Sequence, residues 1–384
     1  MSAASLAAEL ARFDAEGLRR KRRTLQSAQG ARVKVDGREY VAFCSNDYLG
    51  LAAHPELVEA ARAGASAFGV GAGASHLILG HSSAHHELEN ALARFTGCPA
   101  ALYFSSGYMA NLGLVTALAG RGDAVFADKL NHASLNDAAL LSRAEFKRYP
   151  HLDLAALQRL LEATRGGRKV IVSDAVFSMD GDVAPVRSLI ELAETHDAWL
   201  VLDDAHGFGV LGETGRGVLE HAGVRSPRVA YMATLGKAAG VYGAFVAGET
   251  ELVETLVQRA RTYVYTTAPP PLLAHALLKS LELIAREPAR RSHLSKLIEA
   301  LKQGLGRSAW RLLPSDTPIQ PLVIGDSALA VAVSERLASR GLLVPPIRPP
   351  TVPRGTARLR ISLSADHRIE DVERLAEALL SLQA

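Results

Sequence analysis

The chain has 384 residues, a length typical of two domains or of one large domain with a smaller one. Hydrophobic residues make up 48% of the chain and charged residues 22%, which excludes a disordered chain. The 43 basic and 40 acidic residues leave a net charge of only +3, and aromatic residues make up only 5%. This composition argues against a nucleic-acid partner, which would need a basic surface or bases stacked on aromatic rings.

The sequence also argues against export, a membrane span and a cysteine-based site. Cys44 and Cys98 are too few for a disulfide framework or a CxxC metal site, and we expect no metal. Every apolar stretch is broken well before the ~18 residues that a membrane span needs. The N-terminal stretch lacks the apolar core of a secretory signal. We therefore expect a cytoplasmic protein without a membrane partner.

The N-terminal part is expected to hold a helix and a hairpin. Residues 3–27 have the pattern of an amphipathic helix that ends in the basic run Arg19–Arg23. Residues 31–44 alternate apolar and polar side chains around Asp36-Gly37, which predicts a β-hairpin. A helix is predicted over 55–68, and the glycine-rich stretch 69–75 follows it.

From about residue 83 the pattern alternates between helices and short apolar strands. Such runs, with helices between them, predict a mainly parallel sheet buried on both faces. The predicted helices are 84–96, 108–119, 153–164 and 186–196, and the predicted strands are 100–104, 123–127, 169–174, 199–203, 228–233 and 243–248.

Pro269-Pro270-Pro271 marks a break, after which a smaller α+β unit is expected. We predict helices 272–286, 290–306, 327–340 and 367–382, with strands 319–324, 342–346 and 357–363. The predicted division is an N-terminal helix and hairpin segment, 1–47, a large α/β domain, 48–270, and a small C-terminal domain, 271–384. The N-terminal segment is expected to join the C-terminal part.

Chemistry-bearing residues follow several predicted strands. In open α/β sheets, ligands bind at the carboxyl ends of the strands. The turn Ser106-Gly107-Tyr108 before a helix can offer backbone N–H groups to an anion. His132 follows the strand 123–127, Asp203 and His206 follow the strand 199–203, and Lys237 follows the strand 228–233.

Together these groups match the needs of pyridoxal phosphate. Its phosphate needs a helix N-terminus, its aldehyde a lysine, and its pyridine nitrogen a carboxylate that keeps the ring an electron sink. A flat histidine can stack on the ring. A nicotinamide dehydrogenase is less well supported, because the pattern Gly69-x-Gly71-x-x-Ala74 follows a helix and not a strand.

At these residues the chain resembles the α-oxoamine synthases, a family of type I fold pyridoxal-phosphate enzymes. The resemblance covers nearly the whole length. It rests on the motifs Ser45-Asn46-Asp47-Tyr48-Leu49-Gly50, DDAHG at 203–207, TLGK ending in Lys237, and Arg358-Leu359-Arg360. It implies a large domain with a mainly parallel central sheet and a smaller α+β domain. It also implies a catalytic subunit, since a non-catalytic relative is expected to lack the lysine.

The resemblance implies a role for each site residue. Lys237 resembles the lysine that forms the Schiff base with the cofactor, Asp203 would pair with the pyridinium, His206 would pair with the ring hydroxyl, and His132 would stack on the ring. Ser106, Gly107, Tyr108 and Thr234 would hold the phosphate, with Thr267 reaching it from the second subunit of a homodimer. Ser178 lies in the cofactor-side loop, and Asn46 and Arg360 would bind the amino acid carboxylate.

Within the family, the segment 347–353 and the stretch GTARLRISLSADH most resemble the members that condense L-alanine with a pimeloyl thioester, carried by coenzyme A or acyl carrier protein. The glycine-using members are the alternative. We expect Thr351 to reach the substrate site of the neighbouring subunit. Arg19 is expected to pair with the distal carboxylate of the acyl chain, because a guanidinium can bond both carboxylate oxygens. The alternative is that the run Arg19–Arg23 is a solvent-exposed basic surface without a role in substrate binding.

Overall fold

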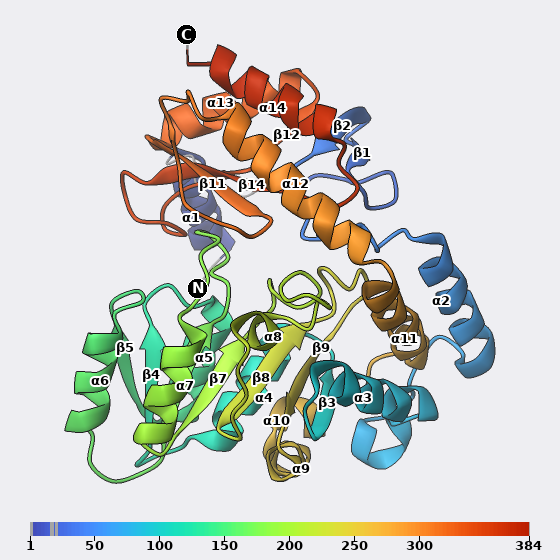
Figure 1. Ribbon diagram of the computed structural model, residues 1–384, viewed down its shortest axis with the longest axis vertical. Helices are drawn as coiled ribbons and strands as arrows, with labels where there is room; N and C mark the ends of the chain where they lie inside the picture. Colours follow the sequence, from blue (N-terminus) through green and yellow to red (C-terminus); the bar gives the residue numbers. More distant parts are fainter. Residues whose placement is uncertain (1–2, 16–18, 20–21, 384) are drawn as a thin grey trace.

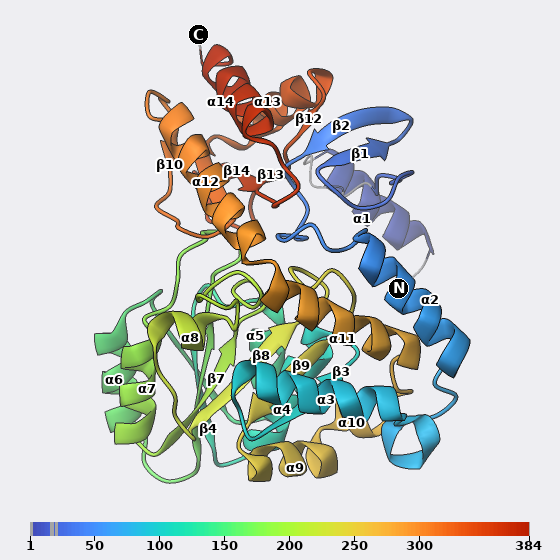
Figure 2. The ribbon, with the colours of Figure 1, turned by 45° about the vertical axis from the view of Figure 1, so that its right-hand side comes forward.

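The computed structural model describes residues 3–15, 19 and 22–383, and these residues form two connected parts (Figure 1). The lower part holds a seven-stranded sheet between two layers of helices. The upper part holds two small sheets and the C-terminal helices. Figure 2 shows α2 (Pro55–Phe68) packed beside α11 (Pro271–Arg286), near the junction of the two parts.

The large sheet has the strand order β3-β9-β8-β7-β6-β4-β5. The pairs β5–β4, β4–β6, β6–β7 and β7–β8 are parallel, and β9 runs antiparallel to both of its neighbours. This confirms the predicted α/β fold with a mainly parallel central sheet. The strands are β3 (Ala100–Phe104), β4 (Ala124–Asp128), β5 (Glu145–Tyr149), β6 (Lys169–Asp174), β7 (Ala198–Asp203), β8 (Val229–Thr234) and β9 (Ala244–Gly248).

Successive side chains of these strands point to opposite faces of the sheet, so an apolar run fills two cores at once. In β6, Ile171 faces one layer of helices, whereas Val170 and Val172 face the other. The first layer comprises α3 (Ser83–Thr96), α6 (Leu154–Ala163), α7 (Val186–Thr195), α8 (Val218–Ala222) and α11. The second layer comprises α4 (Gly107–Leu118), α5 (Ala133–Ser142), α9 (Thr250–Arg259) and α10 (Arg261–Val264).

The upper part joins the two ends of the chain. One sheet has the order β10-β11-β14-β13, and the other has the order β1-β2-β12, in which the C-terminal strand β12 pairs in parallel with the N-terminal strand β2. The strands are β1 (Arg32–Val35), β2 (Arg38–Ala42), β10 (Arg311–Leu312), β11 (Ile319–Gly325), β12 (Leu342–Leu343), β13 (Pro346–Ile347) and β14 (Ala357–Ser362), and the helices are α12 (Pro288–Gly304), α13 (Ser327–Ser339) and α14 (Ile369–Ser381). The predicted domain boundaries at 47/48 and 270/271 stay a prediction.

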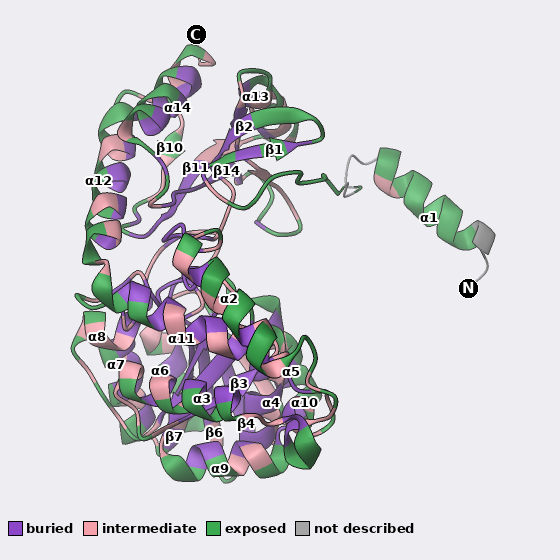
Figure 3. Cartoon of the chain, turned by 90° about the vertical axis from the view of Figure 1, so that its right-hand side faces the viewer, coloured by how far each residue is buried: buried purple, intermediate pink, exposed green. Residues whose placement is uncertain are grey.

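The predicted N-terminal helix over 3–27 is wrong in its length. α1 (Ala3–Ala15) ends at Ala15, and further along Leu25 bridges to Val35 at the end of β1. The pairing with the hairpin gives the backbone at Leu25 partners that a helix could not also use. Figure 3 shows α1 apart from the rest of the chain, with mostly exposed side chains.

Two further segments differ from the sequence-based elements. The predicted strand 342–346 is two short strands, β12 and β13, in different sheets. Between the glycine-rich stretch and α3, the chain forms a single π-helical turn, η1 (His76–Gly80). Among the described residues, no helix is long and apolar enough to cross a membrane.

Candidate active site

A cavity of about 200 Å³ lies at the carboxyl ends of the central strands, where the parallel sheet was expected to bind its ligand. Residues that follow β3, β4, β6, β7 and β8 converge on it. Eight of the predicted site residues line this cavity: Gly107, Tyr108, His132, Ser178, Asp203, His206, Thr234 and Lys237. The other lining residues are Ser134, Asp174, Val176, Ala205 and Met232.

Lys237 lies in the turn after β8 and reaches back into the cavity. Its Nζ atom lies 2.8 Å from Nε2 of His206. Burial lowers the pKa of Lys237 to about 8, although the nearby carboxylate of Asp203 acts in the opposite direction. A far larger fraction of the amine is therefore uncharged near neutral pH than in an exposed lysine, and the uncharged amine is the form that a nucleophile or a base requires.

His206 connects the lysine with a tyrosine on the other side of its ring. The Nδ1 atom of His206 lies 2.6 Å from the hydroxyl of Tyr48. Burial, followed by the charge of Lys237, holds the pKa of His206 well below its usual value, so the ring is neutral. A neutral ring that accepts from a protonated Lys237 at Nε2 must donate from Nδ1 to Tyr48.

Asp203 is the last residue of β7, and its carboxylate is held by two donors. The side-chain amide of Asn111 donates to Oδ2 over 2.7 Å, and the backbone N–H of Ala205 donates to Oδ1 over 3.0 Å. The Asn111 amide also lies 2.9 Å from Oγ of Ser134, which lies 2.8 Å from Nδ1 of His132. A line of hydrogen bonds thus connects Asp203 with His132.

Asn111 is a site residue that the sequence analysis missed. It is buried in α4, a helix that is otherwise mostly apolar. A buried polar residue in such a helix needs a hydrogen-bond partner, and this need was the one sequence signal that pointed to Asn111. The identity of the partner depends on how α4 crosses the sheet, which the sequence does not give.

His132 caps the N-terminus of α5 and is fixed by Asp174 at the end of β6. The backbone N–H of His132 lies 3.1 and 3.2 Å from the two carboxyl oxygens of Asp174. Burial, and then the charge of Asp203, raise the pKa of Asp174 well above its usual value. Burial lowers the pKa of His132, so its ring is neutral and suited to stacking on a flat ligand.

The turn that is predicted to bind an anion lies at the N-terminus of α4. Ser106 caps α4 by accepting a hydrogen bond from Met109 N over 3.2 Å. Gly107 and Tyr108 are the first residues of the helix and line the cavity, and backbone N–H groups at this position have no partner inside the helix. Thr234 faces them from β8, although its hydroxyl donates to the carbonyl of Gly243 over 3.0 Å.

Arg360 and Asn46 lie beside the cavity, brought there from opposite ends of the chain. The guanidinium of Arg360 is buried and donates to the carbonyl of Ser178 over 2.5 Å. It also lies 3.3 Å from Oδ1 of Asn46, which accepts from the hydroxyl of Tyr48 over 3.1 Å. An arginine and an amide at the mouth of the lysine site are suited to binding a carboxylate.

Three predicted residues are not brought to the cavity by this single chain. Thr267 and Thr351 are exposed. Arg19 is exposed and pairs with Asp14, with 2.6 Å between Nη1 and Oδ2. The neighbouring residues 20–21 of the basic run lie outside the described residues. The roles of these three residues stay predictions.

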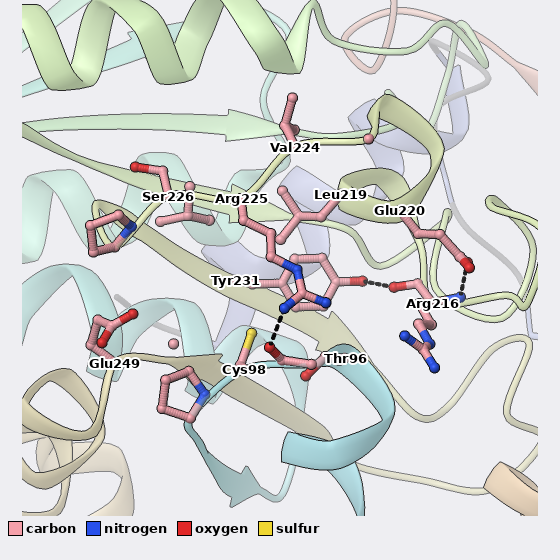
Figure 4. Close-up of a pocket in the computed structure, with 16 residues that line it drawn as sticks. Thr96, Cys98, Arg216, Leu219, Glu220, Val224, Arg225, Ser226, Tyr231 and Glu249 are labelled. Atoms are coloured by element: carbon pink, nitrogen blue, oxygen red, sulfur yellow. Dashed lines mark hydrogen bonds between the residues drawn. The ribbon is translucent and has the colours of Figure 1, made fainter.

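A larger cavity of about 730 Å³ lies at the opposite edge of the sheet (Figure 4). Cys98 precedes β3, Arg225 and Ser226 precede β8, and both strands begin here. Because the parallel strands direct their carboxyl ends away from this edge, it contains neither Lys237 nor Asp203. The larger cavity therefore does not hold the chemistry of the site.

The smaller cavity fits pyridoxal phosphate by the chemistry of its donors. It offers an amine with a lowered pKa, a carboxylate fixed by two donors, a neutral imidazole, and a helix N-terminus at which Gly107 and Tyr108 line the cavity. These are the groups that would hold the aldehyde, the pyridine nitrogen, the ring face and the phosphate.

Comparisons with known proteins agree with this reading. The model of the family "Aminotransferase class I and II" matches residues 38–379. The 8-amino-7-oxononanoate synthase of Nitrosospira multiformis is 66% identical over 94% of this chain and 91% of its own length. That of Nitrosomonas europaea is 62% identical over 99% of both chains.

Solved structures show the same fold. The serine palmitoyltransferase of Sphingomonas wittichii superimposes with a TM-score of 0.93 at 32% identity, covering 98% of this chain and 96% of that one. The 8-amino-7-oxononanoate synthase of Francisella tularensis gives a TM-score of 0.78 at 29% identity, covering 89% of this chain and 97% of that one. The predicted resemblance to the α-oxoamine synthases is confirmed.

Proposed function

The chain belongs to the class I and II aminotransferase family, and within it to the α-oxoamine synthases, and from this premise we propose that it is an 8-amino-7-oxononanoate synthase of biotin biosynthesis. The observation that carries the proposal is the near full-length identity of 66% and 62% to two enzymes of that name, in a chain that keeps Lys237 and Asp203 in one cavity.

The reaction joins L-alanine to a pimeloyl thioester. Alanine loses its α-proton to a base, and its α-carbon forms a bond to the thioester carbonyl carbon while the carbon–sulfur bond breaks and the thiol leaves. The carboxyl group of alanine then leaves as CO2, and a proton takes its place on the α-carbon. Pyridoxal phosphate supplies the electron sink that stabilises negative charge at that carbon.

This chain's own residues hold the cofactor and move the protons. Lys237 would hold the aldehyde and, when released by the amino substrate, is placed to take the α-proton, since its lowered pKa leaves it partly uncharged. Asp203 would keep the pyridine nitrogen protonated, and Asn111 and Ala205 prevent it from turning away. His132 would support the ring face.

The substrates would meet at Lys237 from two sides. Arg360 and Asn46 would bind the carboxylate of alanine. A third cavity, of about 490 Å³, is also lined by Lys237 and Asn46. It extends below the N-terminal hairpin, past Cys44 and Val33. Its volume and its partly apolar lining suit the acyl chain of the second substrate.

We further propose a cytoplasmic homodimer. The π-helical turn η1 exposes three adjacent apolar side chains, Leu77, Ile78 and Leu79, at 48%, 80% and 85% of their full areas. Contiguous exposed apolar groups are typical of an interface. Thr267 and Thr351 are exposed in one chain, which is compatible with contacts to the neighbouring subunit's site.

The test is product identification by mass. The purified protein is mixed with pyridoxal phosphate, pimeloyl-CoA or pimeloyl-acyl carrier protein, and one amino acid from the set alanine, glycine and serine. We expect 8-amino-7-oxononanoate and CO2 with alanine alone. An aminoketone formed faster from glycine would assign the chain to the glycine-using members of the family and overturn the proposal.

A further inference from the structure

His151 lies between two carboxylates at the edge of the candidate site. Its Nδ1 atom is 3.0 Å from Oδ1 of Asp128, and its Nε2 atom is 2.8 Å from Oδ2 of Asp182. A carboxylate accepts hydrogen bonds and donates none, so both ring nitrogens donate and the ring carries both protons. The three side chains therefore form a carboxylate–imidazolium–carboxylate clamp.

One end of this clamp holds the turn that carries His132. Asp128 is the last residue of β4, and its carboxylate also accepts from the backbone N–H groups of Leu130 and Leu152, each over 2.8 Å. His132 lies four residues after Asp128 and caps the N-terminus of α5. The direction in which the turn leaves β4 sets where the His132 ring lies over the cavity.

The other end holds the loop that carries Ser178. Asp182 closes this loop, because its carbonyl accepts from Phe177 N over 3.0 Å. Within the loop, the carbonyl of Ser178 accepts from Nε of Arg360 over 2.5 Å, and the carboxylate of Asp180 accepts from Arg358 over 2.6 Å. The loop therefore aims the arginine that would bind the alanine carboxylate.

We propose that His151 is a positioning residue that ties the His132 turn to the Ser178 loop, and so holds the cofactor ring and Arg360 in register. The inference rests on the proposed function only in its choice of alanine as ligand. His151 touches neither the cavity nor Lys237, so it acts through its two carboxylate partners.

The loss of His151 would release the side chain of Asp182, because no other described residue forms a hydrogen bond with its carboxylate. The Oδ1 atom of Asp182 is buried without a hydrogen-bond partner among the described residues, so Oδ2 and its bond to His151 hold the side chain. Burial lowers the pKa of His151, but the two carboxylates outweigh it and raise the pKa to about 10. The ring stays charged throughout the neutral range.

The experiment compares His151→Ala and His151→Gln holoenzymes with wild type, and uses the surface variant His221→Gln as control. Three quantities are measured at a temperature where each variant is folded: the Kd of pyridoxal phosphate by dialysis, the Kd of alanine by its change in cofactor absorbance without thioester, and kcat with KM. We expect His151→Ala to raise both Kd values by about ten- to a hundredfold, because displacing the groups that bind a ligand weakens their charge-assisted hydrogen bonds to it. His151→Gln should restore part of the loss, and kcat should change less than KM.

A double-variant cycle separates positioning from simple stability. Asp182→Ala and His151→Ala should not be additive in the alanine Kd, because each removes the same bond. Alanine and cofactor Kd values within twofold of wild type in folded His151→Ala protein would overturn the inference, and so would a fall of kcat alone. The cofactor Kd does not depend on the acyl substrate, so a failure of the proposed function would leave this test intact.

Discussion

The amine of Lys237 and the ring of His206 are 2.8 Å apart in a buried environment that favours the neutral form of each. Burial lowers the pKa of both groups, and each positive charge would further disfavour the other. The proton on Lys237 is therefore held less tightly than that of an exposed lysine. This suits a lysine that must release its proton before it can attack an aldehyde.

The first prediction is that capture of pyridoxal phosphate by the cofactor-free protein accelerates with rising pH. The uncharged amine is the nucleophile, and its fraction grows as pH rises through the pKa of Lys237, about 8. We expect the second-order rate constant, followed by visible absorbance, to rise with a midpoint near pH 8 and then level off. A midpoint near the ordinary lysine value of 10.5 would contradict the buried setting of Lys237.

The second prediction concerns Lys237→Ala. The change removes a side chain at the edge of a cavity and opens no hole in the core, so the unfolding temperature should stay near that of wild type. Turnover should be lost, because the variant has neither the amine that holds the cofactor nor the base. The visible absorbance of lysine-bound cofactor should be absent, and a Schiff-base absorbance should arise only when an amine is added. Measurable product from Lys237→Ala would contradict the assignment of this residue.

The third prediction is that Asp203→Asn retains some cofactor but loses most of its activity. An amide cannot stabilise a protonated pyridine nitrogen, so charge at the alanine α-carbon is stabilised less and α-proton exchange should slow by roughly a hundredfold. The new amide nitrogen would also face the Asn111 or Ala205 donors. Exchange of the α-proton with deuterium, read by NMR, provides the measurement. A rate equal to wild type would show that Asp203 does not contact the ring nitrogen.

The sequence predicted the central sheet better than its edge or the N-terminal helix. Continuous apolar runs such as β6 identify buried strands, and the residues after them can be placed at one edge of the sheet. β5 (EFKRY) was not assigned, because it is an edge strand with polar, partly exposed side chains. The helical pattern over 3–27 is only partly realised, because Leu25 pairs with Val35 of the hairpin and not within a helix.

The contacts that complete the site could not be predicted in the same way. The bond from Arg360 to the carbonyl of Ser178 joins residues 182 positions apart and depends on how the upper part sits on the large sheet. The links from Tyr48 to His206 and from Asn111 to Asp203 likewise span more than ninety residues. Residue types and strand ends indicate which groups gather at an edge, but packing decides which of them touch.

The fourth prediction tests the homodimer. If Thr267 and Thr351 reach the neighbouring subunit's site, a Thr267→Ala/Thr351→Ala double variant should lose activity. Mixed with the inactive Lys237→Ala protein, it should form hybrid dimers in which one site has both its lysine and its two threonines. After subunit exchange, we expect each hybrid dimer to regain the activity of one intact site. A fully active monomer in sedimentation would contradict the shared site.

The fifth prediction concerns the end of the acyl chain. A pimeloyl thioester carries a distal carboxylate, and Arg19 is expected to bind it. The present partner of Arg19 is Asp14, in a pair whose side chains remain 43% and 49% exposed. Exposed pairs of this kind contribute about 0–1 kcal/mol, so exchange of Asp14 for a substrate carboxylate costs little.

Arg19→Ala should therefore raise KM for pimeloyl thioester by roughly ten- to a hundredfold, the effect of losing a charge-assisted bond of about 1.5–3 kcal/mol. The Kd of alanine should not change. Heptanoyl thioester has the same length but ends in a methyl group, and wild type and Arg19→Ala should use it equally well. The ratio of kcat/KM for pimeloyl thioester to that for heptanoyl thioester should therefore fall in Arg19→Ala. Asp14→Asn is the matched control, because it frees Arg19 and should leave or lower KM. If both thioesters slow equally in Arg19→Ala, the arginine contacts the carrier phosphates, and if neither slows, the basic run is a solvated face.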